Sequence, residues 1–317
     1  MKKYFPENYL IATLENKNIL SSKAALKEAY YSGRVLEARA TVCDKDHNLH
    51  VDLGVMKGII PRDEGAIGID DGSVRDIAII SRVNKPVVCR IIDFKIDEKG
   101  ETYAVLSRKS VQQDCMRDYI SRLAPGCVID ATVTHMESFG VFADIGAGIS
   151  ALMPIDSISV SRIPHPSARF TPGQKIKAVV KAIDENGRIT LSYKELLGTW
   201  EENAADFAPG ETVPGIVRSV ERYGIFVELR PNLAGLAEYV PGVEPGQHAS
   251  VYIKNLIPER MKIKLIIVDS FDAEYPNQPV TYYNESDFID HWVYSPEGCN
   301  KKIETVFSPY QLTEDAI

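Results

Sequence analysis

Hydrophobic and polar residues alternate along much of the chain after residue 33, which is the pattern of short β-strands with one buried face. The clearest strand follows Gly140. One face of that strand is apolar and consists of Val141, Ala143 and Ile145. Phe142 and Asp144 share the other face, and because a carboxylate needs water unless it is paired, we expect both to point outward.

A second ring precedes this strand. Phe139 stands just before Gly140, and a glycine at that position lets a strand begin or bulge so that a neighbouring ring can approach. A single phenylalanine in a strand is more often a core residue. The shared face with Asp144 reverses that preference here, so we predict that Phe139 and Phe142 form an exposed stacking surface.

The same unit occurs three times, which predicts a tandem-repeat protein. Tyr223-Gly-Ile-Phe226 matches Phe139-Gly-Val-Phe142 at an offset of 84 residues (223 − 139 = 84). The first copy is the most diverged and has His47 and His50 at the two ring positions. Each copy contains five short strands in about 70 residues, which fits a small closed barrel.

Helix-forming residues indicate three helices outside the repeats. One begins at Ser21 or Ser22 and ends at Gly33, and the other two span roughly 108–123 and 194–207. The tail from Phe271 shows no alternation, but it contains too many aromatic residues for a disordered segment. We therefore expect the tail to pack in part against the third barrel.

The predicted fold is all-β, with three tandem five-stranded barrels joined by short helices, an N-terminal helix and an irregular C-terminal tail. The predicted boundaries are 1–32 for the N-terminal segment, 33–110 for the first barrel, 111–123 for a helical linker, 124–197 for the second barrel, 198–208 for a second helical linker, 209–269 for the third barrel, and 270–317 for an acidic, aromatic tail.

The net charge of −8 is concentrated outside the repeats. Each repeat has equal numbers of basic and acidic residues, whereas 270–317 contains 2 basic and 9 acidic residues. A neutral module with a locally basic face can still bind phosphates, so the acidic total does not exclude an RNA-binding protein. It does argue against a protein that binds duplex DNA tightly through charge.

Several classes of protein are not indicated. The chain has no apolar run of about 18 residues and no secretory signal, so we expect a cytoplasmic protein with no membrane partner. Its five cysteines are scattered, without a CxxC pair, which predicts reduced thiols. No catalytic motif is found, so we predict neither enzymatic activity nor a cofactor. Cys43, His47 and His50 have the nearest metal-like spacing, but alternation spreads them over two faces, and no metal site is predicted.

The repeated motifs resemble the S1 RNA-binding domain family. They comprise G-x-V, then [FY]-G-x-F-V-x-[LI], then a G-[LI]-x segment, then PGQ, then R-I-x-L-S, and they cover most of 33–268. The resemblance implies a five-stranded OB-fold in each copy. Three tandem copies without another domain resemble a short form of the bacterial ribosomal S1 proteins, as do VDLG, KGIIPRDE and LSRK in the first copy.

The resemblance also implies an RNA site made of two stacking rings, a histidine after the third strand, and an Asp and an Arg around the last turn. In the second copy these are Phe139, Phe142, Asp184 and Arg188, with Pro154 in place of the histidine. In the third copy Tyr223 and Phe226 match, Lys262 replaces the Arg, and Glu238 replaces the histidine with a carboxylate that repels phosphate. His47 and His50 of the first copy are weaker candidates.

Further cations are expected beside these rings. Strand alternation turns Lys177 and Lys181 outward in the second copy and Lys264 in the third, where they can contact phosphates. An insertion at 155–171 has no counterpart in the third copy. Its Arg162, His165 and Arg169 either extend a binding face or belong to a solvated loop.

The predicted function is sequence-tolerant binding of single-stranded RNA or mRNA by a monomer, associated with the small ribosomal subunit in translation. One alternative is a protein-binding scaffold that docks on the ribosome or on an RNA-processing complex. A second alternative is an accessory RNA-binding subunit of an enzyme that degrades or modifies RNA.

Overall fold

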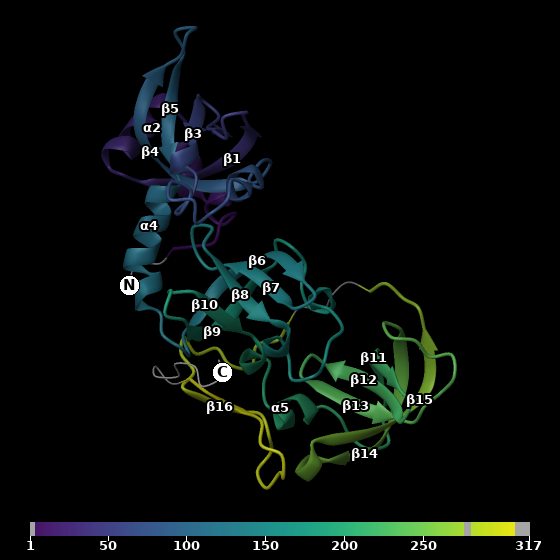
Figure 1. Ribbon diagram of the computed structural model, residues 1–317. Helices are drawn as coiled ribbons and strands as arrows, with labels where there is room; N and C mark the ends of the chain where they lie inside the picture. Colours follow the sequence, from purple (N-terminus) through teal and green to yellow (C-terminus); the bar gives the residue numbers. More distant parts are fainter. Residues whose placement is uncertain (1–3, 276–279, 308–317) are drawn as a thin grey trace. The chain divides into compact units, whose positions relative to one another are not determined.

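The structure is a computed structural model that describes residues 4–275 and 280–307 of the 317-residue chain, and these residues form three closed five-stranded barrels (Figure 1). The chain divides into two compact units. The first is Met1–Leu123 together with the loop Asp144–Ser150, and the second is Ala124–Ala143 together with Ala151–Ile317. The predicted all-β class and tandem five-stranded barrels are confirmed, and the predicted domain boundaries stay a prediction.

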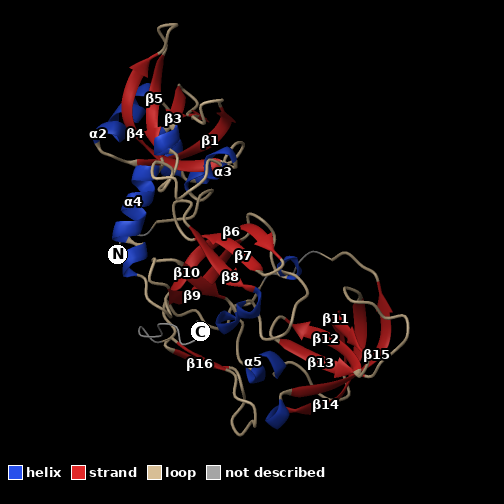
Figure 2. Cartoon of the chain, in the orientation of Figure 1, coloured by secondary structure: helices blue, strands red, loops and turns tan. Residues whose placement is uncertain are grey.

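Strands dominate all three barrels (Figure 2). In the first barrel the strands are β1 (Val35–Cys43), β2 (Leu49–Asp52), β3 (Lys57–Ile60), β4 (Pro86–Ile96) and β5 (Thr102–Ser107). In the second they are β6 (Val128–Glu137), β7 (Gly140–Asp144), β8 (Ser150–Pro154), β9 (Lys175–Ile183) and β10 (Ile189–Ser192). In the third they are β11 (Thr212–Glu221), β12 (Gly224–Arg230), β13 (Leu233–Ala237), β14 (His248–Ile257) and β15 (Lys262–Phe271).

The three barrels share one topology. Around the barrel the strand order is β1-β2-β3-β5-β4 in the first, and the second and third repeat it as β6-β7-β8-β10-β9 and β11-β12-β13-β15-β14. In each barrel the third and fifth strands pair in parallel, whereas the first and fourth strands pair antiparallel. Alternation places the core as predicted, since Val141, Ala143 and Ile145 are all buried.

The N-terminal segment is helical before the first barrel. It contains α1 (Leu14–Ile19) and α2 (Lys23–Tyr31). The hydroxyl of Ser22 accepts a hydrogen bond from the Ala25 amide and caps α2, and Gly33 follows its end with φ +62°. The predicted N-terminal helix is therefore confirmed. A short helix, α3 (Ile77–Ile80), lies between β3 and β4.

The two linkers differ in helical content. The first agrees with the prediction, because α4 (Lys109–Asp118) and a 3₁₀ turn (Ile120–Arg122) fill it. The second was predicted as one helix over 194–207 but consists of a 3₁₀ turn (Lys194–Leu196) and a five-residue helix, α5 (Trp200–Ala204). Gly198, with φ +83°, separates them, because a left-handed residue ends a helix.

The C-terminal segment is less irregular than predicted. It contains β16 (His291–Val293) and β17 (Glu304–Val306), which form a two-stranded antiparallel sheet. The segment reaches the third barrel, as expected, where the Tyr294 hydroxyl donates to the carbonyl of Asn232. It also bonds to the second barrel through the backbone pair Gly126–Ile289. Residues 276–279 and 308–317 of the predicted tail lie outside the described residues.

Candidate nucleic-acid interface

The two rings of the second barrel meet on its outer surface. The centroids of Phe139 and Phe142 are 6.1 Å apart and their planes are perpendicular at 90°. Phe139 is 54% exposed, and Phe142 is half-buried. Gly140 makes this arrangement possible, because a Cβ there would lie 2.4 Å from the carbonyl oxygen of Met153. The glycine is required by the close approach of β8.

The third barrel repeats this geometry. The centroids of Tyr223 and Phe226 are also 6.1 Å apart, with an interplanar angle of 85°, and Tyr223 is 70% exposed. Gly224 takes the place of Gly140, and a Cβ on it would lie 2.5 Å from the carbonyl oxygen of Ala237. Two rings around a glycine therefore produce the same perpendicular pair in both barrels.

Strand register brings a cation to the ring pair of the third barrel. Phe226 of β12 is paired with Leu236 of β13, and Leu236 is paired with Lys264 of β15. Paired residues point to the same side of a sheet, and neighbouring strands are about 4.8 Å apart, so Lys264 lies on the ring face about 10 Å across from Phe226. Lys262, two residues earlier on the same strand, is exposed on that face as well.

In the second barrel Asp184 and Arg188 lie in the turn between β9 and β10. The Asp184 carboxylate accepts hydrogen bonds from the amides of Asn186 (2.9 Å) and Arg188 (2.7 Å), so it closes the turn. The Arg188 side chain is exposed, two residues before Thr190, which is paired with Leu152 of β8. Arg188 is therefore free to contact a phosphate, whereas Asp184 has a structural task in addition to any contact with RNA.

Lys177 and Lys181 lie on β9, and β6 separates that strand from β7, which carries Phe142. The Lys177 amide donates to the hydroxyl of Tyr282 in the C-terminal segment (3.1 Å), and the Lys181 ammonium donates to the hydroxyl of Ser157 (3.0 Å). The C-terminal segment thus contacts β9 at the backbone of Lys177, whereas the Lys181 side chain is bonded within the second barrel.

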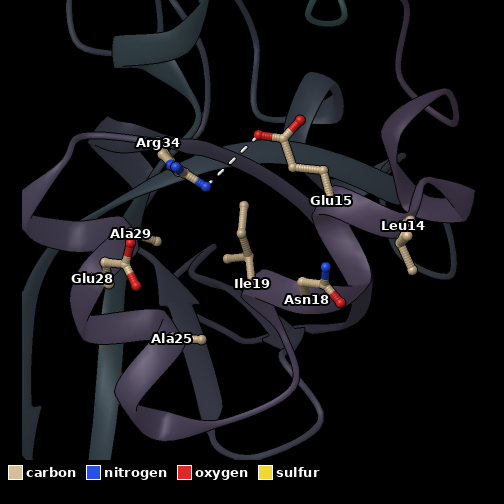
Figure 3. A pocket seen from close by; sticks show the side chains of 8 residues that line it. All are labelled: Leu14, Glu15, Asn18, Ile19, Ala25, Glu28, Ala29 and Arg34. Atoms are coloured by element: carbon tan, nitrogen blue, oxygen red, sulfur yellow. Dashed lines mark ion pairs between the residues drawn. The ribbon is translucent and has the colours of Figure 1, made fainter.

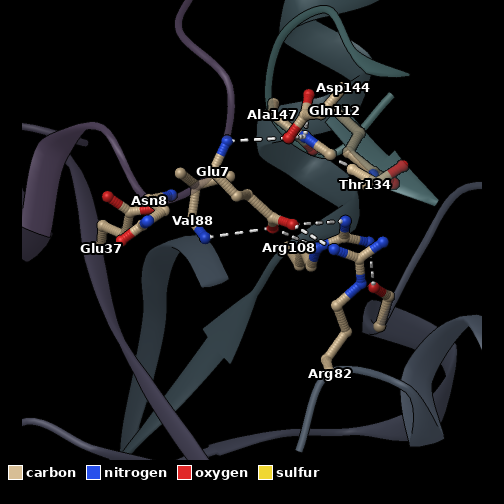
Figure 4. A network of polar contacts seen from close by, with 12 residues as sticks. Glu7, Asn8, Glu37, Arg82, Val88, Arg108, Gln112, Thr134, Asp144 and Ala147 are labelled. Carbon is tan, nitrogen blue, oxygen red and sulfur yellow. Dashed lines mark hydrogen bonds and ion pairs between the residues drawn. The ribbon is translucent and has the colours of Figure 1, made fainter. Parts of the chain in front are cut away.

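The expected exposure of Asp144 is wrong. Asp144 is only 2% exposed, although it follows Phe142 on the outer face. Its carboxylate accepts a hydrogen bond from the amide of Glu7 (2.7 Å; Figure 4). It also accepts from the amides of Gly146 (2.8 Å) and Gly148 (3.0 Å). Burial, together with the nearby charge of Glu7, raises the pKa of Asp144 to about 7. Strand alternation led us to expect that Asp144 is hydrated. Backbone amides of the N-terminal segment and of the loop after β7 form its hydrogen bonds in place of water.

Glu7 is the centre of a buried ionic network in the first unit. Its carboxylate accepts from the guanidinium groups of Arg108 (2.7 Å) and Arg82 (2.8 Å) and from the amide of Val88 (3.3 Å) (Figure 4). Burial opposes ionisation, but the two arginines dominate and lower the pKa of Glu7. The sequence analysis assigned no role to Glu7. In the structure its carboxylate is buried in the first unit and paired with two arginines.

The two histidines of the first barrel do not reproduce the ring pair. His47 has φ +62° in the turn after β1, and its Nδ1 lies 3.6 Å from the carboxylate of Asp76. The Nε2 of His50 lies 3.1 Å from the carboxylate of Asp44. Asn48 stands where the other barrels have the glycine between the rings. Both imidazoles are engaged by carboxylates, which disfavours an approach by phosphate.

The insertion of the second barrel is not a purely solvated loop, because one of its three candidate residues is buried. Arg169 is buried and donates to the carboxylate of Glu228 on β12 and to the carbonyl oxygen of Pro231 (3.1 Å). Arg218 also donates to Glu228, at 2.9 Å. Only Arg162 and His165 of the three predicted residues keep exposed or half-exposed side chains.

One ring of the second barrel was missed by the sequence analysis. His135 of β6 stacks beside Phe142, with centroids 6.3 Å apart. The signal available was its position four residues before Phe139, on the strand expected to pair with the strand of Phe142. Pairing cannot be read from a single strand, and His135 does not belong to the motif.

The first unit also contains a cavity that none of the predicted site residues lines. It has a volume of about 340 Å³, and an ion pair of 3.8 Å between Arg34 and Glu15 lies at its edge (Figure 3). It is lined by Leu14, Glu15, Asn18, Ile19, Ala25, Glu28, Ala29 and Arg34.

Across residues 4–275 and 280–307 there is no cluster of three or more His, Cys, Asp or Glu side chains suited to a metal ion. The helices of those ranges are also too short or too polar to span a membrane.

Comparison with known proteins places residues 122–194 in the family of the S1 RNA binding domain. The chain is 30% identical over 278 residues to small ribosomal subunit protein bS1 of Staphylococcus aureus (strain COL), covering 82% of this chain and 66% of that protein. It is 29% identical over 300 residues to the bS1 homolog of Bacillus cereus, covering 86% of this chain and 75% of that protein.

Among solved structures, the chain resembles a multidomain protein with nucleic acid binding domains from Streptococcus pneumoniae. The sequences are 14% identical, the match covers 77% of this chain and 76% of that one, and the TM-score is 0.24.

Proposed function

Residues 122–194 of this chain belong to the S1 RNA binding domain family, and from that premise we propose that the chain binds single-stranded RNA on the ring pairs of its second and third barrels. The observation that carries the proposal is the recurrence of one geometry. In both barrels two aromatic rings, 6.1 Å apart and nearly perpendicular, stand on the outer surface around a glycine. A surface used only for packing has no reason to leave Phe139 and Tyr223 in water in both copies.

Base stacking supplies the affinity. A base laid on Phe142 or Phe226 gains about 1–3 kcal/mol, and the gain depends little on which base it is, because every base has a π-face. Arg188 in the second barrel and Lys262 and Lys264 in the third add contacts to phosphates, which position the strand without reading its sequence. The proposed binding is therefore sequence-tolerant and favours unpaired RNA, whose bases are free to stack.

The barrels contribute unequally in this proposal. The second barrel has an exposed Arg188 and no carboxylate at Pro154, and it is the main site. In the third barrel the exposed Glu238 takes the position of Pro154 and repels phosphate, so that site is weaker. The first barrel, with His47 and His50 held by carboxylates, is not a site in this proposal.

The names of the relatives support a proposal for the cellular role. Both curated relatives are named as proteins of the small ribosomal subunit, so we propose that this chain holds mRNA near that subunit. The expected result is that the chain co-sediments with small subunits both before and after RNase treatment. If it is lost from the subunits after RNase treatment, RNA alone links them.

The RNA site is tested by fluorescence-anisotropy titration of a labelled, unstructured RNA of about 20 nucleotides and of a matched duplex, each over a salt series. We expect binding to the single strand, with the logarithm of the affinity falling by about 0.7 per phosphate contact for each tenfold increase in salt. Phe142→Ala should weaken binding by about 5- to 150-fold, and Phe226→Ala by less.

The matched control is Tyr31→Ala. Tyr31 is an aromatic residue exposed on α2 of the first barrel's N-terminal segment, which contributes to neither ring pair, and its loss should leave the affinity unchanged. Equal affinity for single strand and duplex, or normal binding by a folded Phe142→Ala variant, would contradict the proposal.

A further inference from the structure

The second barrel has a third exposed ring beside its ring pair. His135 lies on β6, next to the strand of Phe142, and the planes of the two rings differ by only 22° with their centroids 6.3 Å apart. The ring of Phe139 is perpendicular to that of Phe142, with the centroids 6.1 Å apart. Phe142 is thus in contact with two rings, one nearly parallel to its own plane and one perpendicular to it.

The imidazole of His135 is oriented by a neighbour on its own strand. Its Nε2 lies 2.6 Å from a carboxylate oxygen of Glu137, two residues further along β6 and therefore on the same side of the strand. The His135 side chain is 63% exposed. An exposed pair of this kind contributes little to folding, so stability does not explain why a ring is held in this place.

The other barrels show that the fold does not need this ring. In the third barrel Ser219 is paired with Phe226, and Ser219 lies 84 residues after His135, which is the offset between the two repeats. In the first barrel the residue paired with His50 is Val42. Among the three barrels, a ring at this position is therefore found in the second barrel alone.

We propose that His135 is an additional RNA-binding residue, whose imidazole stacks on a base next to the base that Phe142 holds. The proposal rests on the proposed function and deepens it by naming a third ring of the same site. Two nearly parallel rings present faces of the same orientation, as two successive bases of a single strand do when they stack. His135 also differs from the histidine that the family resemblance places after the third strand, where this chain has Pro154.

The experiment compares His135→Ala, His135→Phe and Ser219→Ala in the full chain by anisotropy with the same unstructured RNA. We expect His135→Ala to lower the affinity by about fivefold or more. His135→Phe should keep the affinity within about twofold of the wild type, since it retains a ring for stacking. Ser219→Ala is the matched control at the equivalent position of the third barrel and should change nothing.

The outcomes separate this inference from the proposed function. If Phe142→Ala loses affinity and His135→Ala does not, the inference is wrong and the RNA site of the second barrel consists of the ring pair. If His135→Phe loses as much affinity as His135→Ala, stacking by this ring is also overturned. If neither Phe142→Ala nor His135→Ala affects binding, the proposed function itself fails. Circular dichroism of each variant establishes that the barrels are folded.

Discussion

Arg169, in the insertion of the second barrel, is hydrogen-bonded to Glu228 on the outer face of the third barrel, and both side chains are almost completely buried. Arg218 provides the second partner of Glu228, through two hydrogen bonds of 2.9 Å. Burial lowers the pKa of Arg169, because it removes water from the charged guanidinium. Within the second unit, the Glu228 carboxylate therefore pairs with Arg169 of the second barrel and with Arg218 of the third barrel.

This arrangement predicts a large effect for Glu228→Gln. The substitution leaves two buried arginines close together without a carboxylate between them, and breaking a buried pair in this way costs about 3–5 kcal/mol. Urea unfolding followed by tryptophan fluorescence measures the change, since both tryptophans, Trp200 and Trp292, lie in the second unit. Arg162→Ala, on the exposed part of the same insertion, is the control and should stay within about 0.5 kcal/mol. A Glu228→Gln variant as stable as the wild type would show that the buried pair is not required.

Glu238 predicts a gain of RNA affinity. Its carboxylate is exposed directly after β13, whose Leu236 lies between Phe226 and Lys264. Glu238→Gln removes a negative charge beside the proposed path of the phosphates, so we expect tighter binding by about 0.2–1 kcal/mol, as is usual for exposed charges. The measurement belongs in a Phe142→Ala background, where the third barrel dominates. A gain that persists undiminished at high salt would not be electrostatic and would contradict this explanation.

Asp144 predicts an unusual dependence of stability on pH. Burial raises the pKa of Asp144 to about 7, whereas the pKa of an aspartate in an unfolded chain is about 3.9. Between those values the folded protein holds a proton that the unfolded chain has released. Protonation of Asp144 therefore contributes its full stabilisation of the folded state below about pH 4. This contribution declines as the pH rises and is lost above about pH 7, and the free energy of unfolding falls by at most about 1.4 kcal/mol per pH unit in between.

The comparison of wild type with Asp144→Asn isolates this effect. Asparagine does not titrate, so the difference in unfolding free energy between the two proteins should change between pH 5 and pH 7 and become constant above. Urea unfolding by circular dichroism at several pH values gives that difference. Glu7, whose pKa is lowered, is ionised throughout this range and does not contribute to the slope. A constant difference from pH 5 to pH 8 would mean that Asp144 is ionised in the folded protein.

The cysteines should differ in reactivity. Cys89 and Cys115 are buried, and burial raises the pKa of both thiols, that of Cys115 to about 12. Cys43, Cys127 and Cys299 are partly exposed. The thiolate is the form that reacts. An alkylating reagent should therefore label the three partly exposed cysteines in the native protein, and should label Cys89 and Cys115 only after denaturation. Mass spectrometry of the labelled peptides tests this, and rapid native labelling of Cys89 would contradict the structure.

The ring pairs are the part of the candidate site that local sequence predicts best. Alternation along one strand places Val141 inward and Phe142 outward, and the glycine between the two rings is needed wherever the neighbouring strand approaches closely. These are relations within a few residues, so they recur in the third barrel around Gly224. The pattern of strands and turns predicted three small closed barrels in the same way, whereas the OB-fold of each copy was implied by the resemblance to the S1 domain family.

Tertiary structure decided which parts of the outer faces meet water. Asp144 is covered because the amide of Glu7, 137 residues away in the sequence, bonds to its carboxylate. Arg169 is paired with a carboxylate 59 residues away. Strand alternation tells which face a side chain is on, but it cannot tell what packs on that face, because the covering segments come from distant parts of the chain.

The sequence by itself thus determined the fold, the repeat and the two ring pairs, because these depend on short-range periodicity. Only the tertiary structure placed His135 beside Phe142, set Lys177 against Tyr282 of the C-terminal segment, and engaged His47 and His50 with carboxylates. Each of these depends on strand pairing or on packing between distant segments. The physical reason is that side-chain direction is a local property, whereas burial and contact belong to the assembled chain.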